Sequence, residues 1–206
     1  MKEVTIQAER ISHRYRGEDR AIPSPISFEF RRDEGFLHIS GPNGVGKTTL
    51  VKMLTGEVAV SNGKLCVSDK YWSSFSCIFQ KDGLFPNLTV EENLLAGRVP
   101  INKMNIAFAE YRLDNICQRT ATQLSGGEER RVQIARCVFG DKPSWIADEP
   151  TASLDKQSTM DFARSCISHV VLGGAVIAVS HDGAWISEIF ESLNSKGKFR
   201  ALEVDK

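Results

Sequence analysis

Short apolar stretches separated by polar segments run along the whole chain. Two of them near the N-terminus alternate apolar with polar residues, loosely over 4–8 and strictly over 26–30, as half-buried strands do. The connection between them contains Pro23-Ser24-Pro25 and charged residues near Glu18. Because proline and clustered charge favour turns over ordered elements, we expect an exposed connection there.

Four further apolar runs end at polar or glycine residues, and we expect each to be a buried strand. They are 36–40 before Gly41, 77–79 before Gln80, 145–147 before Asp148, and 175–179 before Ser180-His181. Residues 48–54 space their apolar side chains as a helix that Gly56 closes. Strands that alternate with helices predict a mostly parallel sheet, whose ligands bind beyond the carboxyl ends of the strands.

Residues 82–124 lack any strand pattern. Thr89 and Glu92 form a capping box that opens a helix through Leu95, whereas the weak periodicity of 98–112 places no element. We therefore predict one domain over 1–206, with an α/β core of 1–81 and 125–206 and an inserted helical subdomain of about 82–124. The N-terminal strands are expected to be antiparallel.

Charge and apolar content limit the partners. The 206 residues carry 26 basic and 26 acidic side chains, so nothing predicts capture of nucleic acid. No run approaches the roughly 18–20 apolar residues that cross a bilayer, and the N-terminus lacks a signal-peptide pattern, so any function at a membrane would need a separate membrane partner. The odd number of cysteines without a C-x-x-C pair predicts five buried thiols in a reducing cytosol: Cys66, Cys77, Cys117, Cys137 and Cys166.

The segment after the 36–40 run matches the phosphate-loop pattern G-x-x-x-x-G-K-[ST]. In this pattern backbone N–H groups and the N-terminus of the following helix face phosphates, the lysine reaches the β- and γ-phosphates, and the hydroxyl binds Mg²⁺. An idle glycine turn is the alternative, but the strand before and the helix after argue against it. The predicted ATP-binding residues are Gly41, Pro42, Asn43, Gly44, Val45, Gly46, Lys47, Thr48 and Thr49.

Asp148 and Glu149 follow a buried strand that we expect to neighbour the phosphate loop. One carboxylate can hold Mg²⁺ through water, and the next can activate the attacking water. The alternative is that Asp-Glu-Pro only ends the strand.

The run Leu124-Ser125-Gly126-Gly127-Glu128 contains a second capping box, Ser125 with Glu128, which opens a helix through Ile134. Capping alone would explain these two residues. It does not explain the two glycines, each of which costs a helix about 1 kcal/mol relative to alanine. Paired glycines at a helix N-terminus allow a phosphate to approach the backbone closely, and a head-to-tail dimer could supply that phosphate from a second chain.

The order and spacing of these motifs resemble the ATP-binding cassette (ABC) ATPases over nearly the whole chain, most strongly over 124–155. The resemblance implies a P-loop NTPase that needs Mg²⁺, bound through Thr48, Gln80 and Asp148. It also implies that Tyr15 stacks on adenine, although an edge-strand tyrosine often only packs. The implied catalytic residues are Glu149 as general base, His181 at the γ-phosphate, Gln80 and Lys47. The resemblance further implies that Ser125, Gly126, Gly127 and Glu128 bind the partner's ATP, and that the loop from Ala152 to Asp155 couples the two sites through Ser153 and Asp155.

The leading hypothesis is a transport ATPase, cytoplasmic and peripheral on the inner face of the cell membrane. It would dimerise with an identical or different ABC subunit and dock a membrane permease between Gln80 and Thr89, where Gly83-Leu84-Phe85-Pro86 is apolar; ordinary packing would also explain that lip. Glu128 and the 147–151 run weakly resemble lipoprotein-release, macrolide-export and cell-division ATPases. The chain ends soon after His181, so we expect no appended regulatory domain.

The alternative is a non-transport ABC ATPase of DNA repair, chromosome structure or translation. Such relatives carry long coiled-coil or zinc insertions, or two cassettes, and the sequence has neither. A kinase or GTPase that shares only the phosphate loop would leave Ser125-Gly126-Gly127 and His181 unexplained.

Overall fold

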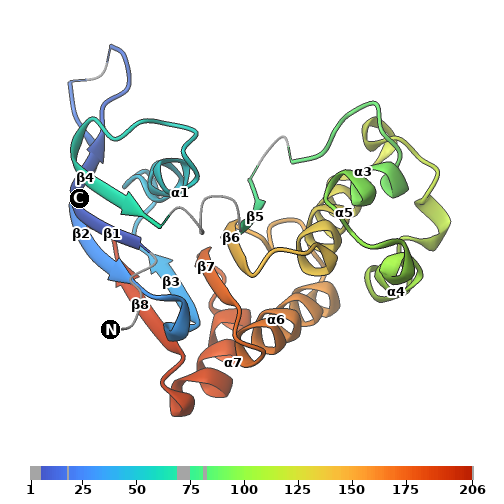
Figure 1. Cartoon of the computed structure of the whole chain (residues 1–206). Helices are drawn as coiled ribbons and strands as arrows, with labels where there is room; N and C mark the ends of the chain where they lie inside the picture. Colours follow the sequence, from blue (N-terminus) through green and yellow to red (C-terminus); the bar gives the residue numbers. More distant parts are fainter. Residues whose placement is uncertain (1–5, 18, 69–74, 81–82, 206) are drawn as a thin grey trace.

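The fold contains two sheets and a group of helices (Figure 1). The computed structural model describes residues 6–17, 19–68, 75–80 and 83–205. One sheet has three antiparallel strands and the other has five parallel strands. The predicted α/β class, with a mostly parallel sheet and antiparallel N-terminal strands, is therefore confirmed.

The three-stranded sheet has the order β2-β1-β4. Its strands are β1 (Ile6–His13), β2 (Ile22–Phe30) and β4 (Asn62–Val67). The predicted strand over 26–30 lies inside β2, and 6–8 lie inside β1, while residues 4 and 5 fall outside the described residues. The expected exposed connection at Pro23-Ser24-Pro25 is wrong, because these residues belong to β2; an edge strand tolerates proline, since one side of its backbone pairs with no neighbour.

The five-stranded sheet has the order β5-β6-β7-β3-β8, and every neighbouring pair is parallel. Its strands are β3 (Phe36–Ser40), β5 (Phe75–Ile78), β6 (Ser144–Asp148), β7 (Ala175–Val179) and β8 (Phe199–Glu203). Every residue of β6 and β7 is buried, as the apolar runs over 145–147 and 175–179 predict for strands covered on both faces.

Six α-helices are described. They are α1 (Lys47–Thr55), α3 (Val90–Ala96), α4 (Ile101–Tyr111), α5 (Gly126–Phe139), α6 (Lys156–Val171) and α7 (Gly183–Leu193). Gly56 closes α1 with a φ of 76°, and the Thr89–Glu92 capping box opens α3, as predicted. Helix α4 occupies the stretch of weak periodicity. The periodicity is weak because Ile101 and Ile106 are apolar but exposed, so they interrupt the helical spacing of the buried apolar residues.

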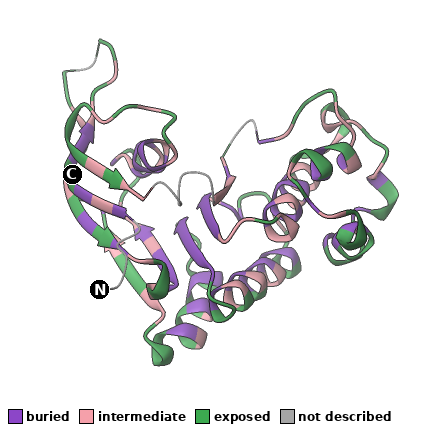
Figure 2. Cartoon of the chain, in the orientation of Figure 1, coloured by how far each residue is buried: buried purple, intermediate pink, exposed green. Residues whose placement is uncertain are grey.

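The core consists of two apolar clusters on opposite faces of the parallel sheet (Figure 2). Successive side chains of a strand point to opposite faces. In β6, Trp145 and Ala147 accordingly join the cluster under helices α3 to α7, whereas Ile146 joins the cluster with α1 and the antiparallel sheet. Burial on both faces fixes the strands, so their carboxyl ends form a rigid edge.

The cysteines do not behave uniformly. Cys137 and Cys166 are buried, Cys77 and Cys117 are half-buried, and Cys66 is exposed, so the prediction of five buried thiols is wrong. Cys66 lies on the edge strand β4, whose alternate side chains face solvent. Among the described residues no group of three or more His, Cys, Asp or Glu side chains could hold a metal ion by itself.

Within the described part of the chain, every helix is too short or too polar to cross a lipid bilayer.

Candidate active site

The phosphate loop joins the carboxyl end of β3 to the first residue of α1, Lys47. Gly46 is the N-cap of this helix with a φ of 108°, and a Cβ there would overlap Ile22 and the backbone of Pro23. Val45 is buried and anchors the loop to the core. The first N–H groups of a helix have no partner inside the helix, so the loop and α1 together present donors and a positive dipole end to an anion.

Lys47 lies beneath this loop, with only 7% of its surface exposed. Its Nζ donates to the carbonyl oxygens of Gly41, at 2.8 Å, and Pro42, at 2.9 Å. Burial lowers the pKa of Lys47, while the negative charges of Glu149 and Asp148 oppose that shift. The ammonium is thus held between the loop and the two carboxylates.

Asp148 ends the buried strand β6 and is 2% exposed. Its Oδ1 has no hydrogen-bond partner among the described residues. Burial raises the pKa of Asp148, against which the Thr48 hydroxyl and the positive charge of Lys47 act. A buried carboxylate oxygen without a partner costs free energy unless a cation or donor satisfies it.

Strand β6 does not pair with β3, because β7 lies between them. The carboxyl ends of the three strands still meet at one edge, and Asp148 and Glu149 line the same cavity as the phosphate loop. The prediction that β6 lies near the phosphate loop is therefore correct in that its two carboxylates line the same cavity, but β6 is not paired with β3, the strand that precedes the loop.

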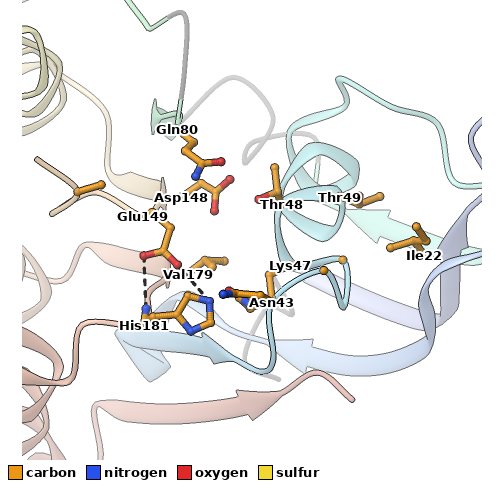
Figure 3. Close-up of a pocket in the computed structure, with 13 residues that line it drawn as sticks. Ile22, Asn43, Lys47, Thr48, Thr49, Gln80, Asp148, Glu149, Val179 and His181 are labelled. Atoms are coloured by element: carbon orange, nitrogen blue, oxygen red, sulfur yellow. Dashed lines mark hydrogen bonds and ion pairs between the residues drawn. The ribbon is translucent and has the colours of Figure 1, made fainter. Parts of the chain in front are cut away.

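Glu149 and His181 contact each other (Figure 3). Glu149 Oε2 accepts a hydrogen bond from the His181 backbone N–H at 3.3 Å, and Glu149 Oε1 lies 3.5 Å from His181 Nε2. The Glu149 backbone has a φ of 47°, a left-handed conformation that costs a non-glycine residue roughly 1–2 kcal/mol. The rigid edge of the sheet holds this carboxylate in place despite that cost.

Gln80 lies just beyond β5 and is exposed. Figure 3 shows the side chains of Gln80, Asp148 and Thr48 turned toward the same space. Carboxylate, amide and hydroxyl oxygens are the ligands that Mg²⁺ prefers. Together with the unpartnered Oδ1 of Asp148, this donor set fits a magnesium ion.

These residues enclose a cavity of about 600 Å³. Ten of its lining residues belong to the predicted site: Asn43, Gly44, Gly46, Lys47, Thr48, Thr49, Gln80, Asp148, Glu149 and His181. The other three are Ala152, which begins the predicted coupling loop, and Ile22 and Val179. Ile22 and Val179 are apolar residues at strand ends, and nothing in the sequence around them signals a site.

Tyr15 follows β1 and contacts Thr49, which lines this cavity. Its hydroxyl lies 3.3 Å from Oγ1 of Thr49, and its ring packs at 79° against His13 with 4.5 Å between ring centres. Tyr15 itself is absent from the cavity wall. Its stacking on adenine stays a prediction.

The run Leu124–Glu128, called the signature run from here on, lies at the N-terminus of α5. Ser125 Oγ accepts from the Glu128 N–H at 3.3 Å, and Glu128 Oε2 accepts from the Ser125 N–H at 2.8 Å. The Ser125 hydroxyl also donates to Glu128 Oε2 at 2.9 Å, and the two hydrogen bonds that Ser125 donates to this carboxylate lower the pKa of Glu128. Among the residues that line the cavity at the phosphate loop there is none from the signature run, so one chain does not bring the two together.

The two signature glycines have different surroundings. A Cβ on Gly126 would meet nothing within 4 Å, whereas a Cβ on Gly127 would lie 3.0 Å from the carbonyl oxygen of Ser153. Ser153 has a φ of 70°, and Asp155 caps α6 by accepting from the Ser158 N–H at 2.8 Å. The predicted coupling residues therefore lie at the loop beside the signature run.

A family model described as "ABC transporter" matches residues 24–152 of this chain. The chain belongs to the ABC transporter family. The cytochrome c biogenesis ATP-binding export protein CcmA of Paracoccus denitrificans is 36% identical over 172 residues, covering 82% of this chain and 80% of that protein. The thiamine import ATP-binding protein ThiQ of Haemophilus influenzae is 32% identical over 154 residues, covering 68% and 71%.

Solved structures agree with this fold. The dimeric structure of the bacterial ABC transporter cassette MJ0796 has a TM-score of 0.77 at 20% identity and covers 97% of this chain and 94% of its own. With its relatives named as ATP-binding export and import proteins, the chain is an ATPase subunit of an ABC transporter. The non-transport alternative is not favoured.

Proposed function

We propose that this subunit binds MgATP in the cavity at the phosphate loop and hydrolyses it only when a second ABC subunit covers that cavity. Closure of the pair would then drive a separate membrane permease. The observation that carries the proposal is the separation of two anion-binding features in one chain: Ser125 and Gly126 of the signature run are exposed, and no residue of that run lines the cavity that contains Lys47 and Glu149.

The phosphates of ATP would take the N–H groups of the loop and of α1, with Lys47 moving from the loop carbonyls to the β- and γ-phosphates. Tyr15, whose hydroxyl lies 3.3 Å from Oγ1 of Thr49, would stack on the adenine. The open, glycine-lined wall at Gly44 gives the phosphates access to backbone donors.

Thr48, Gln80 and Asp148 would hold Mg²⁺. When bound, the ion neutralises phosphate charge and stabilises the transition state of phosphoryl transfer. Asp148 would satisfy its unpartnered Oδ1 through the ion or an ion-bound water. Thr48 and Gln80 approach the same space from α1 and from the end of β5, so the ion would tie two separate segments together.

Glu149 would act as the general base. Its carboxylate is oriented by the His181 backbone N–H and faces the cavity, where it can accept a proton from the attacking water. His181, whose side chain is 45% exposed, would place its ring at the γ-phosphate and report the state of that phosphate to the loop that carries it.

Ser125, Gly126, Gly127 and Glu128 would bind the γ-phosphate of the partner's ATP. Gly126 supports this, because its own chain gives no steric reason for a glycine there. Gly127 has such a reason in the Ser153 carbonyl, and that contact would carry a movement of one site to the Ser153–Asp155 loop of the other. Whether the second subunit is identical or different does not change this geometry.

The permease would dock at the apolar lip of residues 83–86, in which Phe85 and Pro86 are exposed and Gly83 is buried. This lip lies within the predicted stretch from Gln80 to Thr89, of which residues 81 and 82 lie outside the described part. Phe85 is 53% exposed. The buried Asn93 fixes the backbone behind it, since its side chain accepts from the Phe85 N–H at 2.8 Å and donates to the carbonyls of Phe85, Leu88 and Thr89. A rigid apolar lip suits a helix of a membrane protein on the inner face of the cell membrane.

The division of the domain into a core of 1–81 and 125–206 and a helical subdomain of about 82–124 is part of this proposal. All strands described lie in the proposed core, and α3 and α4 lie in the proposed subdomain.

Glu149→Gln tests the composite site. The variant should bind ATP, lose about 10²–10⁴-fold in hydrolysis because the base is gone, and accumulate as an ATP-bound dimer in light scattering. Glu191→Gln, at an exposed position of α7, is the charge-matched control and should remain like the parent. A Glu149→Gln variant that stays monomeric with MgATP, alone and with its permease, would contradict the proposal.

A further inference from the structure

One side of helix α5 carries a row of three polar residues spaced three positions apart, Arg130, Gln133 and Arg136. Two of them contact the chain on either side of Gln80. Arg130 Nη1 donates to the carbonyl of Phe79 at 2.7 Å, and its Nη2 donates to the carbonyl of Gln80 at 3.2 Å. Further along, Arg136 donates to the carbonyl of Gly83. Both described ends of the segment from 79 to 83 are thus attached to α5 by arginines.

Arg130 is the deeper of these attachments and is only 6% exposed. Its third recorded acceptor is Gln133 Oε1 at 3.0 Å, so in the described part of the chain its hydrogen bonds all end on uncharged oxygens. Burying a cation without a hydrogen-bonded carboxylate costs several kcal/mol before its hydrogen bonds and more distant charges offset that cost. A residue that serves packing alone would not need this charge.

The guanidinium holds two consecutive carbonyl groups, one on each side of the Gln80 N–Cα unit. Fixing both neighbouring peptide planes leaves the Gln80 backbone little freedom, so its side chain starts from a defined position. That side chain turns toward Asp148 and Thr48, the other two residues proposed to hold Mg²⁺. Arg130 also interacts electrostatically with Asp148: its positive charge lowers the pKa of Asp148, although the larger effect of burial raises it.

The same helix carries the signature run at its N-terminus. Arg130 lies four residues after Gly126, about 6 Å along the axis at 1.5 Å per residue. A helix is stiff over that length, so a displacement of the signature run must move the arginine and the two carbonyls it holds.

We propose that Arg130 is a positioning residue that couples the signature run to the magnesium site through Gln80. When a partner's phosphate draws in the N-terminus of α5, the Arg130 fork carries that movement to Gln80 and places its amide at the ion. The inference rests on the proposed function, because it assigns a second task to the helix that binds the partner's ATP.

The substitution Arg130→Lys tests whether the positioning of Gln80 needs the shape of the guanidinium or only its positive charge. Lysine keeps the positive charge but has a single ammonium in place of the planar fork, so it does not hold both carbonyls in the same geometry. Arg131→Lys is the matched control, because Arg131 lies on the same helix and its Nε donates to the Tyr111 carbonyl at 3.1 Å, away from Gln80.

The first readout is equilibrium binding of a fluorescent ATP analogue to the full chain, with Mg²⁺ and with EDTA. The gain in affinity that Mg²⁺ brings should fall about 10-fold in Arg130→Lys, within the 10–100-fold that loss of a partner behind a metal ligand typically costs. The affinity in EDTA and the melting temperature should be unchanged. Arg131→Lys should retain the full gain.

The second readout is a double-mutant cycle with Gln80→Ala. If Arg130 acts through Gln80, Arg130→Lys should change the Mg²⁺-dependent gain little once Gln80 is gone, because the two losses are not additive. Additive losses, an unchanged gain in Arg130→Lys, or an equal loss in EDTA together with a lower melting temperature would each overturn the inference. If the unmodified chain fails to bind the analogue, the proposed function fails first, so the two failures are distinguishable.

Discussion

The phosphate loop and the signature run are both glycine-rich entries to a helix, yet their surroundings differ. At the loop, Gly46 is held by its own chain, where Ile22 and Pro23 leave no room for a Cβ. At the signature run, Gly126 faces open space. The loop lines a cavity together with Lys47 and two carboxylates, whereas Ser125 and Gly126 of the signature run are exposed, and Ser125 and Glu128 are paired within their own capping box and with Arg119.

This difference separates two reasons for a glycine. One is steric and can be read within a single fold; the other has no cause inside the chain and therefore points to a contact outside it. Substitutions at the two helices should accordingly fail in different ways, the first by losing ATP and the second by losing only the reaction.

The largest effect is expected from Lys47→Ala. Removing an ammonium that faces the phosphates should lower hydrolysis about 10³-fold and also weaken ATP binding, because both the ground state and the transition state lose a charge. Equilibrium binding of a fluorescent ATP analogue and a phosphate-release assay measure the two losses. If this variant bound ATP as tightly as the parent, the loop would not be part of the ATP-binding site.

Ser125→Asp should lower hydrolysis about 10²-fold without weakening ATP binding to the monomer. Aspartate is as good an N-cap as serine, so α5 should keep its stability, but its charge repels a phosphate. If the subunit pairs with itself, mixing Ser125→Asp with Lys47→Ala should restore part of the activity, since one of the two sites of a mixed dimer is intact. Loss of monomer binding in Ser125→Asp would contradict the assignment in trans.

Asp148→Asn should stabilise the protein by about 0.5–2 kcal/mol near neutral pH while it impairs hydrolysis. Burial raises the pKa of Asp148 above its unfolded value, so the native state binds this proton more tightly than the unfolded state. Stability is then greatest where the carboxyl is protonated and falls as pH rises from the ordinary range of an aspartate through the raised pKa. The gain in Asp148→Asn should thus shrink toward about pH 4 in thermal melts, and the exposed Asp141→Asn should show no such trend.

The smallest effect is expected from Gly126→Ala. Because a Cβ meets nothing there, the substitution should stabilise α5 by up to about 1 kcal/mol, or roughly 2–4 °C in melting temperature. Hydrolysis should nevertheless fall, since a methyl group keeps a phosphate from the backbone. Gly127→Ala is the comparison: the Ser153 carbonyl at 3.0 Å should cancel its helix gain. Full hydrolysis in Gly126→Ala would argue against a phosphate at this position.

The parts of the fold that the sequence predicts are those where one physical signal dominates. Strands β6 and β7 are buried throughout; β7 is an unbroken apolar run, and β6 has three apolar residues in succession before Asp148. Strands β4 and β8 were not predicted, because both lie at sheet edges and mix exposed with half-buried residues, which leaves no clear period. Edge strands owe their pairing to a neighbour far away in sequence.

The functional site likewise has residues that the sequence predicts and residues that it does not. The residues from Gly41 to Thr49 are contiguous, so their motif is visible in the sequence, and Asp148, Glu149 and His181 follow predictable strands. Ile22 and Val179 join them only through folding and carry no chemical signal. Arg130 contacts backbone carbonyls, and a backbone partner leaves no trace in residue types.

The uneven burial of the cysteines provides a built-in reporter. The Cys66 thiol is exposed on β4, whereas burial raises the pKa of Cys77 to about 12 and that of Cys137 and Cys166 well above the ordinary value. Because the thiolate is the reactive form, a maleimide should modify Cys66 first in the native protein, and Cys77 on β5, Cys137 on α5 and Cys166 on α6 should react only as the core opens. The order in which thiols are consumed would therefore time the unfolding of each layer without any added label.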